Sequence, residues 1–135
     1  MTYKILLVDD DPDIRDVVTM ILETKGYETV TACDGIEFLA ALRAEEPDLM
    51  IIDLLMPRMD GFAVLKELEK DEWLEYRSTP ILILSSVREE AARRRYELET
   101  ALEFRFDDYV EKPIIPEVLL ERVEHQKKRG KKSGG

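Results

Sequence analysis

The chain alternates short apolar runs with longer stretches in which apolar residues recur at helical spacing. The apolar runs predict five strands, at residues 3–8, 27–32, 48–53, 80–86 and 107–110. The third run contains four apolar residues in succession between Pro47 and Pro57, a pattern typical of a strand that is buried on both faces.

Each predicted strand is followed by a predicted helix, at residues 12–25, 35–46, 61–71, 89–104 and 116–128. Ile36 and Phe38 are expected to point inward from the second helix, and Leu98 belongs to the apolar stripe expected on the fourth. The first helix has the clearest amphipathic spacing, in which apolar residues follow i, i+3, i+4, i+7 and i+8 at Ile14, Val17, Val18, Ile21 and Leu22.

This fivefold alternation of strand and helix predicts an α/β fold. Parallel strands need crossover connections, which helices supply, so the strands are expected to form one parallel sheet covered on both faces. The expected domain spans residues 1–126, and residues 127–135 are expected to form a basic, disordered tail. A length of 135 residues is in the usual range for one domain.

Polar residues stand where the predicted strands end. Asp9 and Asp10 follow the first strand, Asp53 ends the third, Ser85 ends the fourth, and Lys112 follows the fifth. In a parallel sheet all of these positions share one edge. Clustered carboxylates repel one another unless a cation lies among them, and oxygen ligands favour Mg²⁺. With a hydroxyl and an ammonium beside them, they predict a phosphoryl-transfer site.

The same acids have simpler interpretations. Taken alone, Asp53 fits equally well as a cap of the following turn. Asp11 and Asp13 fit better as helix-start residues than as ligands. The spacing Asp9-x-Asp11-x-Asp13 hints at a calcium loop, but the required glycine is replaced by Ile14, so this interpretation is discounted.

Composition and charge exclude several classes of protein. Apolar runs are too short for a membrane helix, and the N-terminus turns acidic too early for a signal peptide. The single cysteine, Cys33, excludes an internal disulfide. Net charge is −10, and the tail carries five positive charges and no acid, which leaves −15 on the rest. An acidic body argues against direct nucleic-acid binding.

Four sequence blocks resemble the receiver domain of two-component response regulators, over residues 3–125. This resemblance implies a flavodoxin-like, doubly wound parallel sheet with strand order 2-1-3-4-5, an order that receiver proteins exemplify. The matching blocks are Val8-Asp9-Asp10, Asp53-Leu54-Leu55-Met56-Pro57-Arg58-Met59-Asp60-Gly61, Pro80-Ile81-Leu82-Ile83-Leu84-Ser85 and Asp108-Tyr109-Val110-Glu111-Lys112-Pro113-Ile114.

The resemblance implies a phosphoacceptor and a metal site. Asp53 corresponds to the residue that accepts a phosphoryl group from a histidine kinase or phosphotransfer protein. Asp9 and Asp10 correspond to the acids that hold Mg²⁺ together with Asp53. The backbone carbonyl of Leu55 corresponds to the remaining protein ligand.

The resemblance also implies switch residues. Ser85 corresponds to the hydroxyl that moves to the phosphoryl group, and Tyr109 to the aromatic residue that turns inward with it. Lys112 corresponds to the ammonium that pairs with the phosphoryl group. Its bond to Pro113 is expected to be cis.

Two departures from the family pattern affect the expected partner surface. Arg105 and Phe106 stand where small residues are usual, and the span from Ser85 to Lys112 is longer than is common. Both lie near the face formed by the fourth helix, fifth strand and fifth helix, through which many receivers bind targets or dimerise. A downstream protein target and a possible homodimer are therefore expected, with the partner's identity open.

The leading hypothesis is a cytoplasmic, phosphorylation-dependent signalling switch that catalyses only its own phosphoryl transfer and dephosphorylation, and so is not an enzyme. It would act alone, relay phosphate, or be part of a longer chain. One alternative is a receiver-fold module that binds partners without phosphorylation. Another is a small aspartyl phosphatase, since Asp9-x-Asp11 follows the first strand, but that leaves Asp53 and Lys112 unexplained.

Overall fold

A computed structural model describes residues 2–56, 58–100 and 105–134 of the chain. Strands and helices alternate along it as predicted. The strands are β1 (Lys4–Val8), β2 (Glu28–Ala32), β3 (Leu49–Asp53), β4 (Ile81–Ser85) and β5 (Asp108–Glu111). The helices are α1 (Pro12–Glu23), α2 (Gly35–Glu45), α3 (Gly61–Glu67), the 3₁₀ helix η1 (Asp71–Tyr76), α4 (Val87–Thr100) and α5 (Pro116–Gly134).

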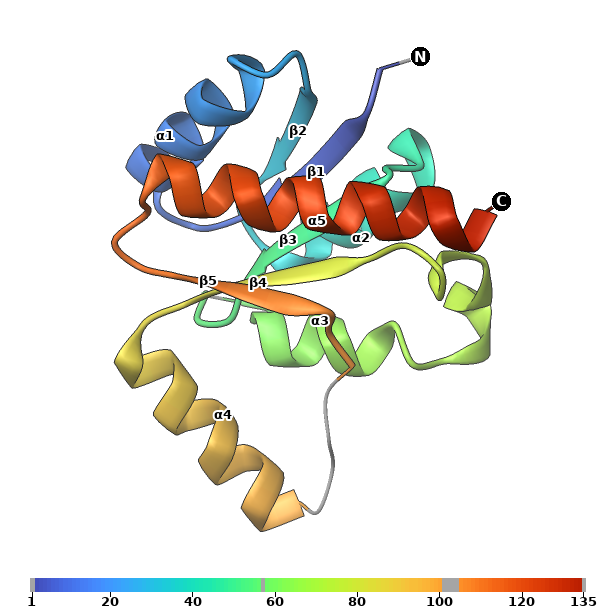
Figure 1. The fold of residues 1–135 in the computed structure, drawn as a ribbon. Coiled ribbons are helices and arrows are strands. Elements are labelled where there is room, and N and C mark those ends of the chain that lie inside the picture. The colour runs from blue at the N-terminus through green and yellow to red at the C-terminus, as the bar shows by residue number, and fades with distance from the viewer. Residues whose placement is uncertain (1, 57, 101–104, 135) are drawn as a thin grey trace.

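The five strands form one parallel sheet in the order β2-β1-β3-β4-β5. This is the flavodoxin-like order, and the predicted fold class is confirmed. Because all strands run the same way, their carboxyl ends lie along one edge of the sheet (Figure 1). Strand β3 lies at the centre of that order, which places Asp53 in the middle of the edge.

Two apolar layers hold the helices onto the sheet. Alternate residues of β1 and β3 face opposite sides, so Leu6 and Ile52 pack with α2 and α3, whereas Ile5 and Ile51 pack with α1 and α5. Every residue of β3 is buried, as expected for a strand covered on both faces. The central strand therefore gives its terminal carboxylate a rigid support.

Three residues predicted to face inward are exposed instead. Val17 is 43% exposed, Ile36 57% and Leu98 85%. In α2 the buried positions are Gly35, Phe38 and Leu42, and Ile36 lies about 200° around the helix from Phe38, since each residue turns the helix by about 100°. The prediction for Ile36 was wrong for this geometric reason.

Two segments differ from their predicted structure. The segment between α3 and β4, for which no helix was predicted, contains the 3₁₀ helix η1, whose turn buries Trp73 and Tyr76 against the core. Helix α5 continues to Gly134, beyond its predicted end near residue 128, and the expected disorder of residues 127–135 stays a prediction. Gln126 is buried, and the Lys127 ammonium lies 5.3 Å from the centre of the Tyr27 ring. Lys, Arg and Gln are also good helix formers. The domain boundary at residue 126 stays a prediction.

Candidate functional site

The carboxyl ends of β1 and β3 bring three acids together. Val8 pairs with Ile52 in the sheet register, so the residues that follow, Asp9 and Asp53, lie side by side at the edge of the sheet. One carboxylate oxygen from each of Asp9, Asp10 and Asp53 lies within 4.8 Å of the other two. Asp9 and Asp53 are buried, whereas Asp10 is exposed. The cluster is thus open to solvent on one side.

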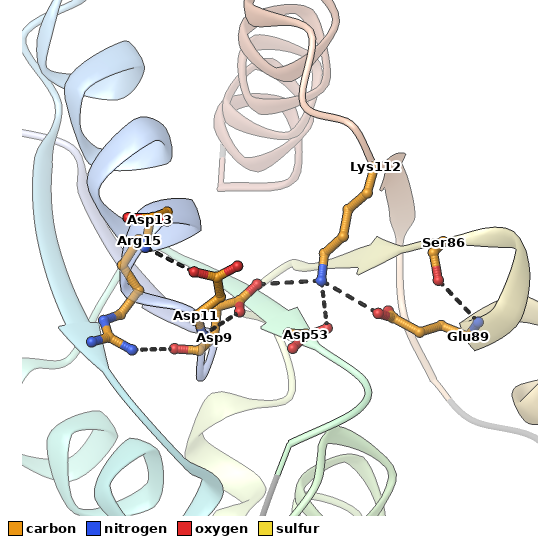
Figure 2. A network of polar contacts seen from close by, with 8 residues as sticks. All are labelled: Asp9, Asp11, Asp13, Arg15, Asp53, Ser86, Glu89 and Lys112. Atoms are coloured by element: carbon orange, nitrogen blue, oxygen red, sulfur yellow. Dashed lines mark hydrogen bonds and ion pairs between the residues drawn. The ribbon is translucent and has the colours of Figure 1, made fainter.

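Lys112 reaches this cluster from the end of β5. Its Nζ lies 3.0 Å from Asp53 Oδ1 and 3.5 Å from Asp9 Oδ2 (Figure 2). The backbone amide of Lys112 donates to the carbonyl oxygen of Ser85 at 2.7 Å, which extends the pairing of β5 with β4 up to this residue. The Lys112–Pro113 bond is cis, the isomer that the resemblance implies.

A fourth acid, Glu89, also contacts Lys112, although nothing in the sequence pattern singled it out. Glu89 lies in the first turn of α4 and is buried, and its Oε1 is 3.3 Å from Lys112 Nζ (Figure 2). Its backbone amide donates to Ser86 Oγ at 3.2 Å. The spacing Ser86-x-x-Glu89 is a helix-start signature, but it does not predict the contact with Lys112.

The crowded carboxylates change the proton affinities at the site. Burial, followed by repulsion from Asp9 and Glu89, raises the pKa of Asp53 to about 8. Burial likewise raises the pKa of Asp9. Burial alone would lower the pKa of Lys112, but attraction to its carboxylate partners, Asp53 first, outweighs burial and raises this pKa. One ammonium therefore compensates only part of the negative charge.

The two predicted switch residues lie on the neighbouring strands β4 and β5. Ser85 is fully buried at the end of β4, and within the described residues its Oγ has no hydrogen-bond partner. Tyr109 on β5 is 41% exposed. A buried hydroxyl without a partner costs about 1–3 kcal/mol, so Ser85 is available to bond a group that enters the site.

The loops around the cluster are fixed by short polar contacts. The amide of Asp11 donates to Asp9 Oδ1 at 2.9 Å, and Asp11 in turn caps α1 through the amide of Asp13. Asp11 and Asp13 are helix-start residues, as expected. These contacts fix one Asp9 oxygen and leave the other directed at Lys112.

The loop after β3 packs so closely that it requires a glycine. A Cβ at Gly61 would lie 2.7 Å from the Cα of Leu54 and would overlap the carbonyl oxygen of Asp53. Asp60 caps α3 through the amide of Ala63. Leu55 lies in this loop, two residues beyond Asp53, and Pro57 is outside the described residues.

Arg105 and Phe106, the two departures from the family pattern, lie just before β5, and both contact other parts of the chain. The Arg105 guanidinium donates to the carbonyl oxygens of Arg77 and Thr79. The Arg93 guanidinium on α4 lies 5.4 Å from the centre of the Phe106 ring. Arg105 therefore contacts the segment between η1 and β4, and Phe106 contacts α4. A role of either residue in partner binding stays a prediction.

The donor set fits a magnesium ion. All three acids offer oxygen, the ligand atom that Mg²⁺ prefers, and Mg²⁺ is often held by one or two carboxylates with waters and phosphate. Asp9 Oδ2 is buried and, among the described residues, has no hydrogen-bond partner. A divalent cation would offset the repulsion that raises the pKa of Asp53.

This fold, with an acid cluster and a lysine at the carboxyl edge of the sheet, defines the class of receiver-like α/β domains. The sequence profile of the response regulator receiver domain matches residues 5–124. The chain belongs to the response regulator receiver domain family.

Curated relatives include transcriptional regulators. The chain is 40% identical over 120 residues to the probable transcriptional regulator ycf27 of Cyanophora paradoxa, a match that covers 89% of this chain and 46% of that protein. It is 37% identical over 123 residues to the alkaline phosphatase synthesis transcriptional regulatory protein PhoP of Bacillus subtilis, covering 91% and 48%. The chain thus spans about half the length of these relatives.

Solved structures show the same fold. The chemotaxis response regulator CheY4 of Vibrio cholerae is 33% identical, with a TM-score of 0.76, covering 93% of this chain and 99% of that one. NtrX of Brucella abortus is 30% identical, with a TM-score of 0.80, covering 98% of this chain and 28% of that one.

Family membership supports a role in phosphorylation-dependent signalling, since receiver domains of response regulators are phosphorylated by histidine kinases. One relative is named a DNA-binding response regulator, so the expected absence of nucleic-acid binding stays a prediction. In the part of the chain that the structure describes, none of the helices has the length and apolar character needed to cross a membrane.

Proposed function

We propose that this chain is a signalling switch that accepts a phosphoryl group on Asp53. The observation that carries the proposal is the 3.0 Å contact between Asp53 Oδ1 and Lys112 Nζ inside the acid cluster. Lys112 is close enough to stabilise negative charge on a group attached to Asp53. The buried Ser85 hydroxyl supplies a second donor from the neighbouring strand.

In the proposed reaction, one Asp53 carboxylate oxygen attacks the phosphorus of a phosphorylated histidine on a kinase or phosphotransfer protein. A P–O bond forms, the P–N bond breaks, and the electron pair leaves on the imidazole. The product is an acyl phosphate. The chain catalyses only this transfer and the later hydrolysis of its own phosphoryl group, so it is not an enzyme that turns over an external substrate.

Asp9, Asp10 and Asp53, with the Leu55 carbonyl, are the residues that would hold Mg²⁺. The bound ion would supply charge neutralisation for the phosphoryl oxygens. Within the chain itself, Asp9 Oδ1 is fixed by the Asp11 amide, and Lys112 holds Asp53 in place through its ammonium. The acceptor carboxylate is therefore oriented before a donor arrives.

We infer that the signal leaves through the face formed by α4, β5 and α5. Ser85 and Tyr109 lie on the neighbouring strands β4 and β5, and both are in states that a phosphoryl group can change: an unpartnered hydroxyl and a partly exposed ring. This face would contact a downstream protein or a second copy of the chain. A histidine kinase as donor and a cytoplasmic location remain part of this proposal.

Incubation with acetyl phosphate and Mg²⁺, followed by intact mass measurement, tests the proposal. The parent chain is expected to gain one phosphoryl group, and Asp53→Ala is expected to gain none. Asp71→Ala, which removes a fully exposed acid on η1, is the matched control and should behave as the parent.

Absence of phosphorylation in the parent would refute the switch and favour a module that binds without phosphorylation. Continuous phosphate release that depends on Asp9 and survives Asp53→Ala would instead indicate a phosphatase.

A further inference from the structure

Helix α4 has few buried side chains that hold it to the rest of the molecule. Among its described side chains, Glu89 is the one that is buried, at 6% exposed. The apolar residues Ala92 and Tyr96 are only partly buried where they pack on the core, and Leu98 is 85% exposed. Figure 1 shows α4 extending away from the sheet from the end of β4. An element with so few buried apolar contacts is weakly held.

The buried anchor of α4 is thus a carboxylate, and its partner is the lysine of the proposed phosphorylation site. Glu89 Oε1 is 3.3 Å from Lys112 Nζ, while Oε2 is buried and has no hydrogen-bond partner among the described residues. Lys112 also contacts Asp53 at 3.0 Å and Asp9 at 3.5 Å. Three carboxylates share one ammonium, so each competes with the other two.

A phosphoryl group on Asp53 changes this competition. It replaces one negative charge with about two and carries three strong acceptor oxygens. These oxygens need the ammonium that Glu89 now contacts, and their charge repels the Glu89 carboxylate at close range. Because Glu89 is buried, its charged form becomes unfavourable there once the phosphoryl group takes the ammonium.

We propose that Glu89 is a positioning residue that links the phosphorylation state of Asp53 to α4. Without the phosphoryl group, Lys112 holds Glu89 and so fixes the first turn of α4. When the phosphoryl group takes over Lys112, Glu89 leaves its buried position and the first turn of α4 is released. This inference rests on the proposed function, because it requires a phosphoryl group on Asp53.

Amide hydrogen exchange of α4, measured in the full chain with Mg²⁺ and with or without acetyl phosphate, tests the link. In the parent, phosphorylation is expected to accelerate exchange in α4 roughly fivefold, the factor for one unit-charge interaction at about 4 Å in water. Glu89→Gln has nearly the same shape but no charge. Without the phosphoryl group, α4 of this variant is expected to exchange roughly fivefold faster than α4 of the parent. Phosphorylation of the variant is expected to accelerate its α4 exchange by less than about twofold.

The control is Glu99→Gln, which removes an exposed charge from the same helix and should match the parent in both states. Exchange in β1 and β3 reports whether each variant is folded. If α4 exchanges equally fast in Glu89→Gln and in the parent without phosphodonor, Glu89 does not hold α4 and the inference is refuted. This comparison needs no phosphoryl transfer, so it is independent of the proposed function.

The parent alone also tests the release step. If intact mass shows one phosphoryl group on the parent and α4 exchange does not change, the inference is refuted while the proposed function stands. If the parent gains no phosphoryl group, the proposed function fails, and the release step fails with it.

Discussion

Replacing Asp53 with asparagine should stabilise the metal-free protein. The Asp53 carboxylate is 1% exposed and lies beside Asp9 and Glu89, so its charged form is unfavourable when no cation is added. Asparagine has the same shape as the protonated acid and still offers an oxygen to the Lys112 ammonium. The variant therefore removes the unfavourable charge and keeps the contact.

The magnitude follows from the two pKa values. The ordinary pKa of 3.8 is raised to about 8 in the folded protein. Between these values the folded protein holds a proton that the unfolded chain has lost, so the parent's free energy of unfolding falls by up to about 1.4 kcal/mol per pH unit as pH rises. The asparagine side chain of the variant does not titrate. At pH 7, roughly 3 pH units above the ordinary pKa, this slope gives at most about 4 kcal/mol. We therefore expect Asp53→Asn to be more stable than the parent by on the order of 2–4 kcal/mol.

Urea unfolding in EDTA, at several pH values between about 5 and 8.5, measures this difference. The advantage of Asp53→Asn should grow with pH and become constant above the raised pKa. Mg²⁺ should reduce it, because the ion would favour the charged carboxylate of the parent. Asp71→Asn, at an exposed position, should show no such trend. A difference that does not change with pH would refute the assignment of the raised pKa to Asp53.

Three further substitutions test the packing that supports the site. Gly61→Ala should cost about 1–3 kcal/mol, because the added Cβ would meet the backbone at the end of β3, whereas Gly130→Ala has open space and should not destabilise the protein. Trp73→Ala should cost about 3–5 kcal/mol, and Leu74→Ala, at an exposed neighbour, less than about 0.5 kcal/mol. Arg105→Ala should cost about 1–3 kcal/mol through the lost bonds to two backbone carbonyls. Chemical unfolding measures all of them, and equal effects within either matched pair would contradict the packing described.

The period of the apolar residues predicted the five strands, the five helices and a parallel sheet, whereas the strand order was predicted from the resemblance to receiver domains. Buried strands such as β3 appear as uninterrupted apolar runs, and α1 has a stripe at helical spacing. Details that depend on neighbouring elements were not predictable in this way. The 3₁₀ helix η1 forms where Trp73 and Tyr76 are buried in the core. Ile36 is apolar but faces solvent, because a different side of α2 packs on the sheet.

The site was predictable to the extent that it lies at strand ends. Parallel strands end at the same edge, so Asp53 and Lys112 were expected to be neighbours although they are 59 positions apart. Glu89 was missed because it lies in a helix rich in charged residues, where an acid usually faces water. The direction of the Glu89 side chain depends on how the first turn of α4 is oriented relative to the end of β4.

By itself, the sequence determined the order of strands and helices and placed the polar residues at the strand ends, because periodicity and strand ends are local properties of the chain. The tertiary structure decided which of the 30 acidic residues act on one another. Burial and charge interactions depend on distance in space, and these distances give Asp53 its raised pKa and join Glu89 to Lys112.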